Sequence, residues 1–447
     1  MTFVEKMDQY IDAYTDLYRF SGMLRITQRD QIVYQRNVGY ADIEQKVPFS
    51  TSSVFTLYSI SKPFCAIGLL RLAEKGLVDI NAHPSKYLKE AEGADSRITI
   101  RHLMHHISGL RDFSEERSFI ERSYQTWHCP DMRQAVAEIV RCPLNFQPGE
   151  GSQYANINFT IQALIIENVS GMKYADYMAT EVFAPLGMKN TRIDQLGLLI
   201  DHRVRGYGIN GGEIISVERV SPDFFIGAGD VISTIEDVYR LNHAIKHRLL
   251  LKPETWDMVL TPSPVNVFGM GCQVVDWHGK TRIQHNGGSS GFRTLHIYVP
   301  EDDLDIILLS NFGFGDARWS FVQAIYTAFY GDAASDSGAE SMDSGYITEL
   351  YRSLPDGFLP KKKPKIELSA EAEAAILGVY ESPVDQSRSV VTKEEDGTYC
   401  ITSNGWQKLY CYPTGNDVLA NCYIDEAYKI LRDQSGRVMI NGKIKIG

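Results

Sequence analysis

Residues 56–68 read TLYSISKPFCAIG, and they place a serine and a lysine three positions apart at the start of an apolar segment. Ser59 and Lys62 would lie on the same face of a helix, because residues i and i+3 are neighbours on a helical surface. Pro63 fits a helix only in its first turn, where a missing N–H group costs little. The stretch therefore predicts a helix that begins near Ser59 and ends at Gly76, a suitable C-terminal cap.

This pair of residues has two interpretations. A serine hydroxyl is a weak nucleophile until a neighbouring group takes its proton, and Lys62 lies close enough in sequence to assist. The N-terminus of a helix also offers unpaired amides and a favourable electrostatic end. Serine is, however, a common N-cap residue, so Ser59 could simply cap the helix. The pair alone does not decide between a nucleophile and a cap.

A second polar segment, GSQYANIN, covers residues 151–158 and precedes a predicted helix. A nearby lysine ammonium favours the phenolate form of a tyrosine, so Tyr154 could act as a general base and later return the proton. The amide of Asn156 could hold both a lysine and a substrate carbonyl. The alternative for Tyr154 is an ordinary place in the core or in a turn.

A third segment, IQHNGGSSGFR, covers residues 283–293 and places His285 at the end of a predicted strand. Gly287 and Gly288 would let a substrate backbone lie close to that strand. The N–H group of Gly288 could join that of Ser59 in an oxyanion hole. The alternative is a glycine-rich hairpin turn with a surface histidine.

The order of the predicted elements indicates an α+β fold. Residues 22–42 have two β-rich runs around Arg29-Asp30, which predicts a hairpin. Residues 97–225 are mainly helical in pattern, and three strand-like runs and a helix follow between 280 and 331. An antiparallel sheet built from both ends of this region, flanked by helices and with a helical region inserted, is the most economical arrangement.

The predicted domain boundaries follow changes in composition. Residues 1–332 form the first domain, and residues 333–370, which are small, polar and rich in proline and lysine, form a linker. Residues 371–447 contain short β-like runs about ten residues apart, which predicts a small antiparallel β-barrel. Trp406 and Tyr410 are expected in the core of this barrel.

Composition excludes several kinds of partner. The 447-residue chain has a formal net charge of −11, which argues against nucleic acid or an anionic membrane as a partner. No apolar stretch is long enough to span a bilayer. We expect a small-molecule or peptide substrate, and the sequence leaves the oligomeric state open.

The termini and cysteines indicate the cytoplasm. The N-terminal segment carries Asp8, Asp12 and Asp16, which predicts an amphipathic helix and no signal peptide. The seven cysteines are scattered, with no CxxC pair, so neither a disulfide framework nor a zinc ribbon is indicated. A trimmed secreted protein is the alternative.

No motif requires a cofactor, and we expect no metal site. His102, His105 and His106 form an HxxHH pattern, but it lacks the adjacent glutamate of the zinc-binding HExxH motif.

Taken in order, Ser-x-x-Lys, Tyr-x-Asn and His-x-Gly resemble the three active-site motifs of the serine β-lactamase and penicillin-binding-protein superfamily. The resemblance is strongest to the branch of class C β-lactamases, D-alanyl-D-alanine peptidases and related esterases. Two accessory segments, HLMHHISGL and GAGDVISTIEDVYR, are also similar to segments of that branch. The resemblance covers residues 8–330, and the C-terminal region resembles a lipocalin-like barrel appended to some members.

The resemblance implies a role for each motif residue. Ser59 would be the acylated nucleophile, and Lys62 and Tyr154 would share the transfer of protons. Asn156 would position Lys62 and the substrate amide, and His285 would bind or polarise the substrate from the sheet edge. Gly287 and Gly288 would contact the substrate, with the amides of Gly288 and Ser59 forming the oxyanion hole.

One departure from the family pattern affects the expected substrate. The third motif of β-lactamases is usually Lys-Thr-Gly, whereas here it begins with His285. A histidine is only partly charged near neutral pH and is less suited to a β-lactam carboxylate. We therefore expect a serine hydrolase that cleaves an amide or ester, such as a D-amino-acid peptide or a small ester. The alternatives are a β-lactamase or penicillin-binding activity, and a non-catalytic ligand-binding or sensor protein.

Overall fold

The computed structural model describes residues 2–115, 131–277, 279–313, 317–330, 359–360, 362–383, 386–424, 427–433, 435–440 and 442–446. The chain divides into two compact units. The sheet unit comprises residues 22–205 and 218–311, and the barrel unit comprises residues 1–21, 206–217 and 312–447. Most of the predicted linker lies outside the described residues. Within the described ranges, no helix is long and apolar enough to cross a membrane.

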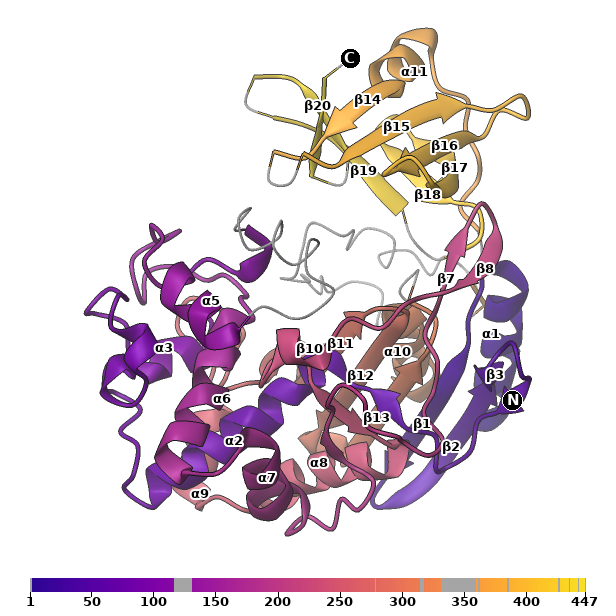
Figure 1. The fold of residues 1–447 in the computed structure, drawn as a ribbon. Coiled ribbons are helices and arrows are strands. Elements are labelled where there is room, and N and C mark those ends of the chain that lie inside the picture. Colours follow the sequence, from indigo (N-terminus) through magenta and orange to yellow (C-terminus); the bar gives the residue numbers. More distant parts are fainter. Residues whose placement is uncertain are drawn as a thin grey trace. The chain divides into compact units, whose positions relative to one another are not determined.

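The sheet unit is built on a six-stranded antiparallel sheet (Figure 1). Strands from both ends of the unit meet at its centre, where β1 pairs with β13 and Leu24 lies opposite Leu308. This confirms the predicted α+β class and the sheet made from distant parts of the chain. In spatial order the strands are β10 (Gln273–Trp277), β11 (Lys280–Ser289), β12 (Phe292–Val299), β13 (Leu304–Ser310), β1 (Gly22–Gln28) and β2 (Gln31–Val38).

The local sequence explains the centre of this sheet. Every residue of β13, LDIILLS, is buried, as expected of a strand covered on both faces. The β1–β2 hairpin turns at Arg29 and Asp30, whose φ angles of 51° and 61° suit a two-residue turn. The predicted hairpin is therefore present, with the turn at the predicted residues.

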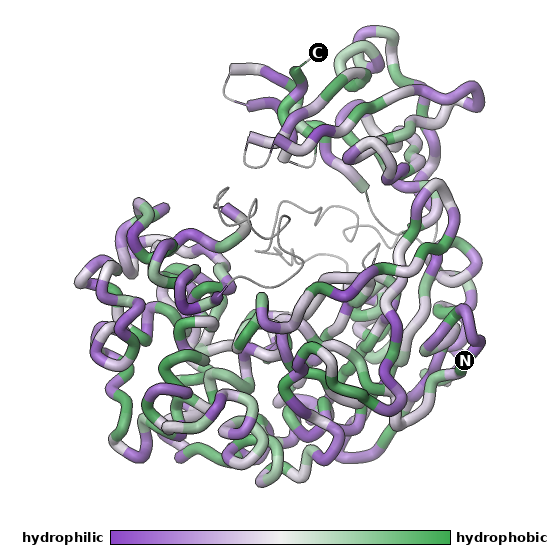
Figure 2. The backbone as a smooth tube through the Cα atoms, in the orientation of Figure 1, coloured by the Kyte–Doolittle hydropathy of each residue, from purple (hydrophilic) through white to green (hydrophobic). Residues whose placement is uncertain are grey.

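Helices and short strands lie between β2 and β10 in the sequence. Helices α2 and α6 are buried along most of their length and pack on each other, and Figure 2 shows long hydrophobic stretches in this unit. The helices are α2 (Ser61–Glu74), α3 (Ile100–Met104), α5 (Met132–Ile139), α6 (Ile157–Ser170), α7 (Tyr174–Met178), α8 (Ile235–His247) and α9 (Pro253–Val259). The short strands are β3 (Tyr40–Asp42), β4 (Val47–Pro48), β5 (Phe55–Thr56), β6 (Arg192–Ile193) and β9 (Val231–Ser233).

The barrel unit contains a closed barrel of eight antiparallel strands. This agrees with the predicted C-terminal β-barrel, although a short helix, α11 (Ala370–Ile376), precedes its first strand. The strands are β14 (Gly378–Glu381), β15 (Arg388–Lys393), β16 (Tyr399–Ser403), β17 (Gln407–Gly415), β18 (Val418–Asn421), β19 (Ala427–Arg432), β20 (Val438–Ile440) and β21 (Lys443–Lys445).

Two helices and a two-stranded hairpin also belong to this unit. Helices α1 (Phe3–Leu17) and α10 (Ala317–Tyr330) pack together, and the hydroxyl of Tyr10 donates a hydrogen bond to the carbonyl of Ser320 at 3.1 Å. The hairpin of β7 (Tyr207–Asn210) and β8 (Glu213–Ser216) contacts β17, where the amide of Gly211 donates to the carbonyl of Lys408 at 2.9 Å.

The core assignment of Trp406 is wrong. Its side chain is 59% exposed, because it lies in the turn between β16 and β17 and not on an inward-facing strand position. Residues with the same β-type pattern supply the barrel core instead, among them Tyr399, Ile401 and Leu419.

A buried carboxyl group in the sheet predicts an unusual dependence of stability on pH. Asp305 on β13 is 3% exposed, and burial raises the pKa of its carboxyl to about 7. Its folded pKa therefore lies above the unfolded value of about 3.9. Ionisation at higher pH then opposes folding, and this cost grows between about pH 4 and pH 7 and is constant above that.

Replacing Asp305 by asparagine should therefore stabilise the protein at pH 8 and have little effect near pH 4. We expect the free energy of unfolding to rise by about 1–3 kcal/mol at pH 8, because the amide stays neutral in both states. Urea denaturation of both proteins at pH 4.5 and pH 8 measures this. A stability difference that does not grow with pH would contradict the assigned cost of ionising Asp305.

Candidate active site

Ser59 lies in a 3-10 turn, η1 (Tyr58–Ile60), that runs directly into helix α2. The N-cap position of α2 is Ile60, and no side chain caps the helix there. The hydroxyl Oγ of Ser59 instead accepts a hydrogen bond from Lys62 Nζ at 3.1 Å. The interpretation of Ser59 as a helix cap is therefore wrong, and its side chain faces a lysine as a nucleophile would.

The ammonium of Lys62 is surrounded by oxygen atoms. Lys62 is fully buried, and its Nζ donates to Ser59 Oγ at 3.1 Å, to Asn156 Oδ1 at 2.9 Å and to the carbonyl of Ala228 at 2.8 Å. An ammonium has three N–H donors, and these three acceptors match them. The surroundings therefore stabilise Lys62 as a hydrogen-bond donor that points at the hydroxyl of Ser59.

Tyr154 is brought to the same place from another part of the chain. Lys62 Nζ lies 4.6 Å from the centre of the Tyr154 ring, a distance at which a cation and an aromatic ring attract each other. The ring of His106 also stacks on the ring of Tyr154, and the two ring centres lie 4.4 Å apart. Phe268 lies 5.8 Å away. These contacts fix the ring of Tyr154 beside Lys62.

The three histidines of HLMHHISGL point to different partners. His102 accepts from the amide of Thr99 at the start of α3, and His105 Nδ1 donates to the carbonyl of Phe268 at 2.9 Å. His106 Nδ1 accepts from the amide of Ala155 at 3.2 Å, and burial lowers the pKa of its imidazole. His106 is thus a neutral ring that supports Tyr154, a function that its sequence pattern did not reveal.

Asn156 joins Lys62 to a buried acid that the sequence did not indicate. Its Nδ2 donates to Asp112 Oδ2 at 3.0 Å, while its Oδ1 accepts from Lys62. The other carboxylate oxygen, Asp112 Oδ1, accepts from the amide of Ile157 at 3.1 Å. Asp112 lies two residues after HLMHHISGL, and its position there is the only sequence signal that could have drawn attention to it.

Gly287 of β11 lies directly against the backbone of the nucleophile. A methyl group added at Gly287 would lie 2.0 Å from the carbonyl oxygen of Leu57 and 3.0 Å from the amide nitrogen of Ser59. Thr294 on the neighbouring strand donates through Oγ1 to the same Leu57 carbonyl at 2.7 Å. The glycine thus lets the sheet edge approach Ser59, which is a packing role that the sequence did not indicate, and the contact with substrate stays a prediction.

Gly288 has more space around it than Gly287. A methyl group there would meet the Arg293 side chain at 3.0 Å and 3.2 Å and the Phe292 carbonyl oxygen at 3.4 Å. Gly288 therefore does not pack on the Ser59 backbone as Gly287 does.

His285 lies on the same strand as the two glycines. It is 1% exposed, and its Nδ1 donates to the carbonyl of Asn286 at 2.7 Å. Its ring centre is 6.2 Å from that of Tyr154. The prediction of a surface histidine is therefore wrong.

The carbonyl of Ala228 belongs to a turn that a buried aspartate braces. Asp230 Oδ2 accepts from the amide of Gly227 at 2.9 Å, which closes the turn that presents Ala228 to Lys62. Burial raises the pKa of Asp230 to about 7. Cys65 lies one turn after Lys62 and is fully buried, and burial raises the pKa of its thiol, so it acts as a packing residue.

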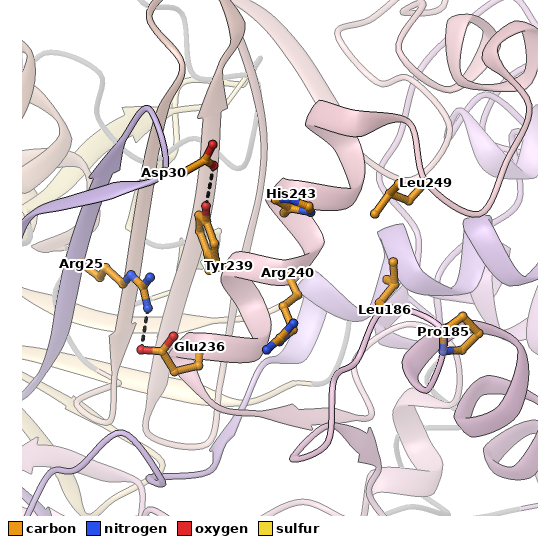
Figure 3. A pocket seen from close by; sticks show the side chains of 9 residues that line it. All are labelled: Arg25, Asp30, Pro185, Leu186, Glu236, Tyr239, Arg240, His243 and Leu249. Carbon is orange, nitrogen blue, oxygen red and sulfur yellow. Dashed lines mark hydrogen bonds and ion pairs between the residues drawn. The ribbon is translucent and has the colours of Figure 1, made fainter.

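A hollow of about 390 Å³ lies beside α8 (Figure 3). Two pairs of its lining residues contact each other: Arg25 Nη1 lies 2.6 Å from Glu236 Oε1, and the Tyr239 hydroxyl donates to Asp30 at 2.8 Å. None of the predicted site residues lines this hollow, and we assign no ligand to it.

The family model described as Beta-lactamase matches residues 7–320. Among curated proteins, penicillin-binding protein 4* of Bacillus subtilis is 29% identical over 314 residues, which is 66% of this chain and 68% of that protein.

Several solved structures share the fold. The octameric penicillin-binding protein homologue from Pyrococcus abyssi superposes with a TM-score of 0.65 at 18% identity and covers 98% of this chain and 95% of its own. The hydrolase EstCE1, described as having promiscuous acyltransferase activity, has a TM-score of 0.63 at 20% identity, with coverage of 73% and 98%. D-amino acid amidase from Ochrobactrum anthropi has a TM-score of 0.60 at 21% identity, with coverage of 72% and 99%.

Proposed function

The chain belongs to the Beta-lactamase family, and from this premise we propose that it is a serine hydrolase that forms an acyl-enzyme on Ser59. Its substrate in this proposal is an amide or an ester, either a D-amino-acid peptide or a small ester. The observation that carries the proposal is the hydrogen bond from the buried Lys62 Nζ to Ser59 Oγ at 3.1 Å, with the ring of Tyr154 4.6 Å from the same Nζ.

Acylation begins when Ser59 Oγ attacks the substrate carbonyl carbon. The new C–O bond forms as the serine proton leaves Oγ, and the carbonyl oxygen takes the negative charge. Because three oxygen acceptors use the donors of Lys62, the lysine is better placed to stabilise charge than to accept this proton. Tyr154, as a phenolate stabilised by the nearby cation, takes the proton in the proposed step.

The tetrahedral intermediate then collapses to the acyl-enzyme. The bond from the carbonyl carbon to the leaving nitrogen or oxygen breaks, and Tyr154 returns its proton to that atom. The backbone amides of Ser59 and Gly288 are the proposed oxyanion hole, and the contact of Gly287 with the Ser59 backbone supports this arrangement. Water then cleaves the acyl bond by the same steps, and Ser59 recovers its proton.

His285 favours an uncharged acyl group over a β-lactam. A lysine at this position would carry a permanent positive charge toward a substrate carboxylate, whereas an imidazole carries no permanent charge. The imidazole of His285, on the strand that also carries Gly287, is the proposed contact for the substrate. The names of two structural neighbours, a D-amino acid amidase and a hydrolase with acyltransferase activity, suggest substrates to try first.

A panel of three substrates tests the proposal. We expect kcat/KM for a p-nitrophenyl ester or a D-amino-acid amide to exceed that for a chromogenic cephalosporin by at least about tenfold, because the cephalosporin carboxylate lacks a fixed cation. Ser59→Ala should abolish turnover of all three. Faster turnover of the cephalosporin would refute the reading of His285, and turnover by Ser59→Ala would refute the nucleophile.

A second candidate function is capture of penicillin without efficient turnover. The 29% identical relative named penicillin-binding protein 4* favours it. A stable penicilloyl adduct on Ser59, together with no turnover of the ester and the amide, would support this candidate over the hydrolase.

A further inference from the structure

We propose that Asp112 is a positioning residue that sets the amide orientation of Asn156 and thereby aims Lys62 at Ser59. This inference rests on the proposed function, because it concerns the activation of Ser59. It names a residue outside the three sequence motifs, and it follows from a chain of contacts that runs from a buried carboxylate to the nucleophile.

The chain of contacts has three steps. Asp112 Oδ2 accepts from Asn156 Nδ2 at 3.0 Å, Asn156 Oδ1 accepts from Lys62 Nζ at 2.9 Å, and Lys62 Nζ donates to Ser59 Oγ at 3.1 Å. Asp112 is separated by 44 residues from Asn156 in the sequence, so the fold brings them together. Each N–H donor in this series of contacts faces an acceptor.

The carboxylate makes only one orientation of the Asn156 amide favourable. An ionised carboxylate accepts hydrogen bonds and donates none, so it selects the NH2 end of the amide. The oxygen end then faces Lys62. If the amide turned by about 180°, its NH2 group would face the ammonium and its oxygen would face the carboxylate, which would cost both hydrogen bonds.

Asp112 itself is held in place by the helix that carries Asn156. Its second oxygen accepts from the amide of Ile157 at 3.1 Å, in the first turn of α6. Asp112 is 7% exposed, and its own backbone amide donates to Glu115 Oε1 at 3.0 Å. The carboxylate therefore accepts hydrogen bonds both from the side chain of Asn156 and from the backbone amide of the next residue.

Charge supports the same assignment. Burial raises the pKa of the Asp112 carboxyl, while the hydrogen bonds from Ile157 and Asn156 and the charge of Lys62 act against this. Lys62 is thus linked to Asp112 through the neutral amide of Asn156. A direct pair would draw Nζ away from Ser59, whereas the intervening amide leaves one ammonium N–H for the nucleophile.

The test measures how fast Ser59 is modified by a fluorophosphonate. The reagent forms an Oγ–P bond and releases fluoride, so its rate reports the activation of Ser59 and needs no knowledge of the substrate. We expect Asp112→Ala to lower the maximal rate of modification about 10- to 100-fold, with the half-saturating concentration changed less than about threefold. The rate for Asp112→Asn should lie between those of the wild type and Asp112→Ala. The new side chain has one oxygen, which can accept from Asn156 or from Ile157 but not from both.

A double-mutant cycle shows whether Asp112 acts through Asn156. In an Asn156→Ala background, Asp112→Ala should lower the rate by less than about threefold, because the amide it orients is gone. Rate losses that simply multiply would overturn the inference. If Asp112→Ala does not fold, the same cycle with Asp112→Asn decides the question. An unmodified Ser59 in the wild-type protein would instead refute the proposed function.

Asp237 on α8 provides a matched control. Its carboxylate is also buried, with a pKa raised by burial, and it accepts from the amide of Asn190 at 2.8 Å and from Thr191 Oγ1 at 2.9 Å. We expect Asp237→Asn to lower thermal stability and leave the rate of Ser59 modification near that of the wild type. An equal loss of rate in Asp237→Asn would show that the Asp112 effect is a general loss of structure and would overturn the inference.

Discussion

We expect Lys62→Met to lose most of the reactivity of Ser59 while it still folds. Methionine has a similar length and fills the same fully buried space, but it has no hydrogen to donate to Ser59 Oγ. The positive charge that favours a Tyr154 phenolate is also lost. We expect the rate of acylation to fall by about 10² to 10⁴, the range that a positioned acid–base group contributes, because Tyr154 loses the cation that favours its phenolate.

The substitution also leaves two buried oxygens without their donor, Asn156 Oδ1 and the carbonyl of Ala228. Each unsatisfied buried acceptor costs about 1–3 kcal/mol, so Lys62→Met should have a lower melting temperature than the wild type. Folding of the variant therefore has to be checked by circular dichroism before its reactivity is interpreted.

The measurement is the mass of the intact protein after exposure to a fluorophosphonate, followed over time. Lys75→Met is a suitable control, because Lys75 directly follows the same helix and its side chain is 46% exposed and pairs with Glu181. The control should react as the wild type does. Equal labelling of Lys62→Met and the wild type would exclude the lysine from activation of Ser59 and would favour the non-catalytic alternative.

The sequence was sufficient for the parts of the site that are local. Ser59 and Lys62 are three residues apart at a helix start, and helical geometry alone brings their side chains together. The runs that became β11, β12 and β13 were predicted because β-type residues recur between turn residues, and β13 is also almost continuously apolar, as expected of a strand buried on both faces. The grouping of Tyr154 and His285 with Ser59 required the resemblance to a known family, since no local rule joins them.

Other parts of the site could not be predicted, for two physical reasons. The Ala228 carbonyl that holds Lys62 is a backbone group, and a sequence does not show where a carbonyl 166 residues away will point. The stacking of His106 on Tyr154 depends on a φ angle of 58° at His106 and on packing around it, which no periodic pattern encodes. Asp112 was missed because a single aspartate in a loop resembles any other.

Gly287 has a role in packing that its sequence pattern did not indicate. The pattern predicted that this glycine makes room for a substrate, and that contact stays a prediction. In the structure, the missing side chain makes room for the protein itself, because the Leu57 carbonyl and the Ser59 amide occupy the space that a Cβ would need. Glycine at a strand position often marks such a close approach of two backbones, and the sequence does not say which backbone it is.

Gly287→Ala is therefore expected to damage both stability and activity. The added methyl would lie 2.0 Å from the Leu57 carbonyl oxygen and 2.5 Å from Thr294 Oγ1, and backbone on both sides limits relief of the clash. Overpacking of this kind costs about 1–3 kcal/mol of folding free energy, and sometimes more. Because the displaced segment carries Ser59, we expect the acylation rate to fall by about 100-fold as well.

Gly288→Ala provides the comparison for stability, because it adds the same methyl group one residue away. That methyl would mainly meet the Arg293 side chain, at 3.0 Å and 3.2 Å, and a long flexible side chain can move aside. Urea denaturation should place Gly288→Ala within about 0.5 kcal/mol of the wild type and Gly287→Ala well below it. Equal stabilities would mean that β11 can shift away from Ser59 at little cost. The position of Ser59 would then be fixed by η1 and α2 alone, and its packing against β11 would contribute little.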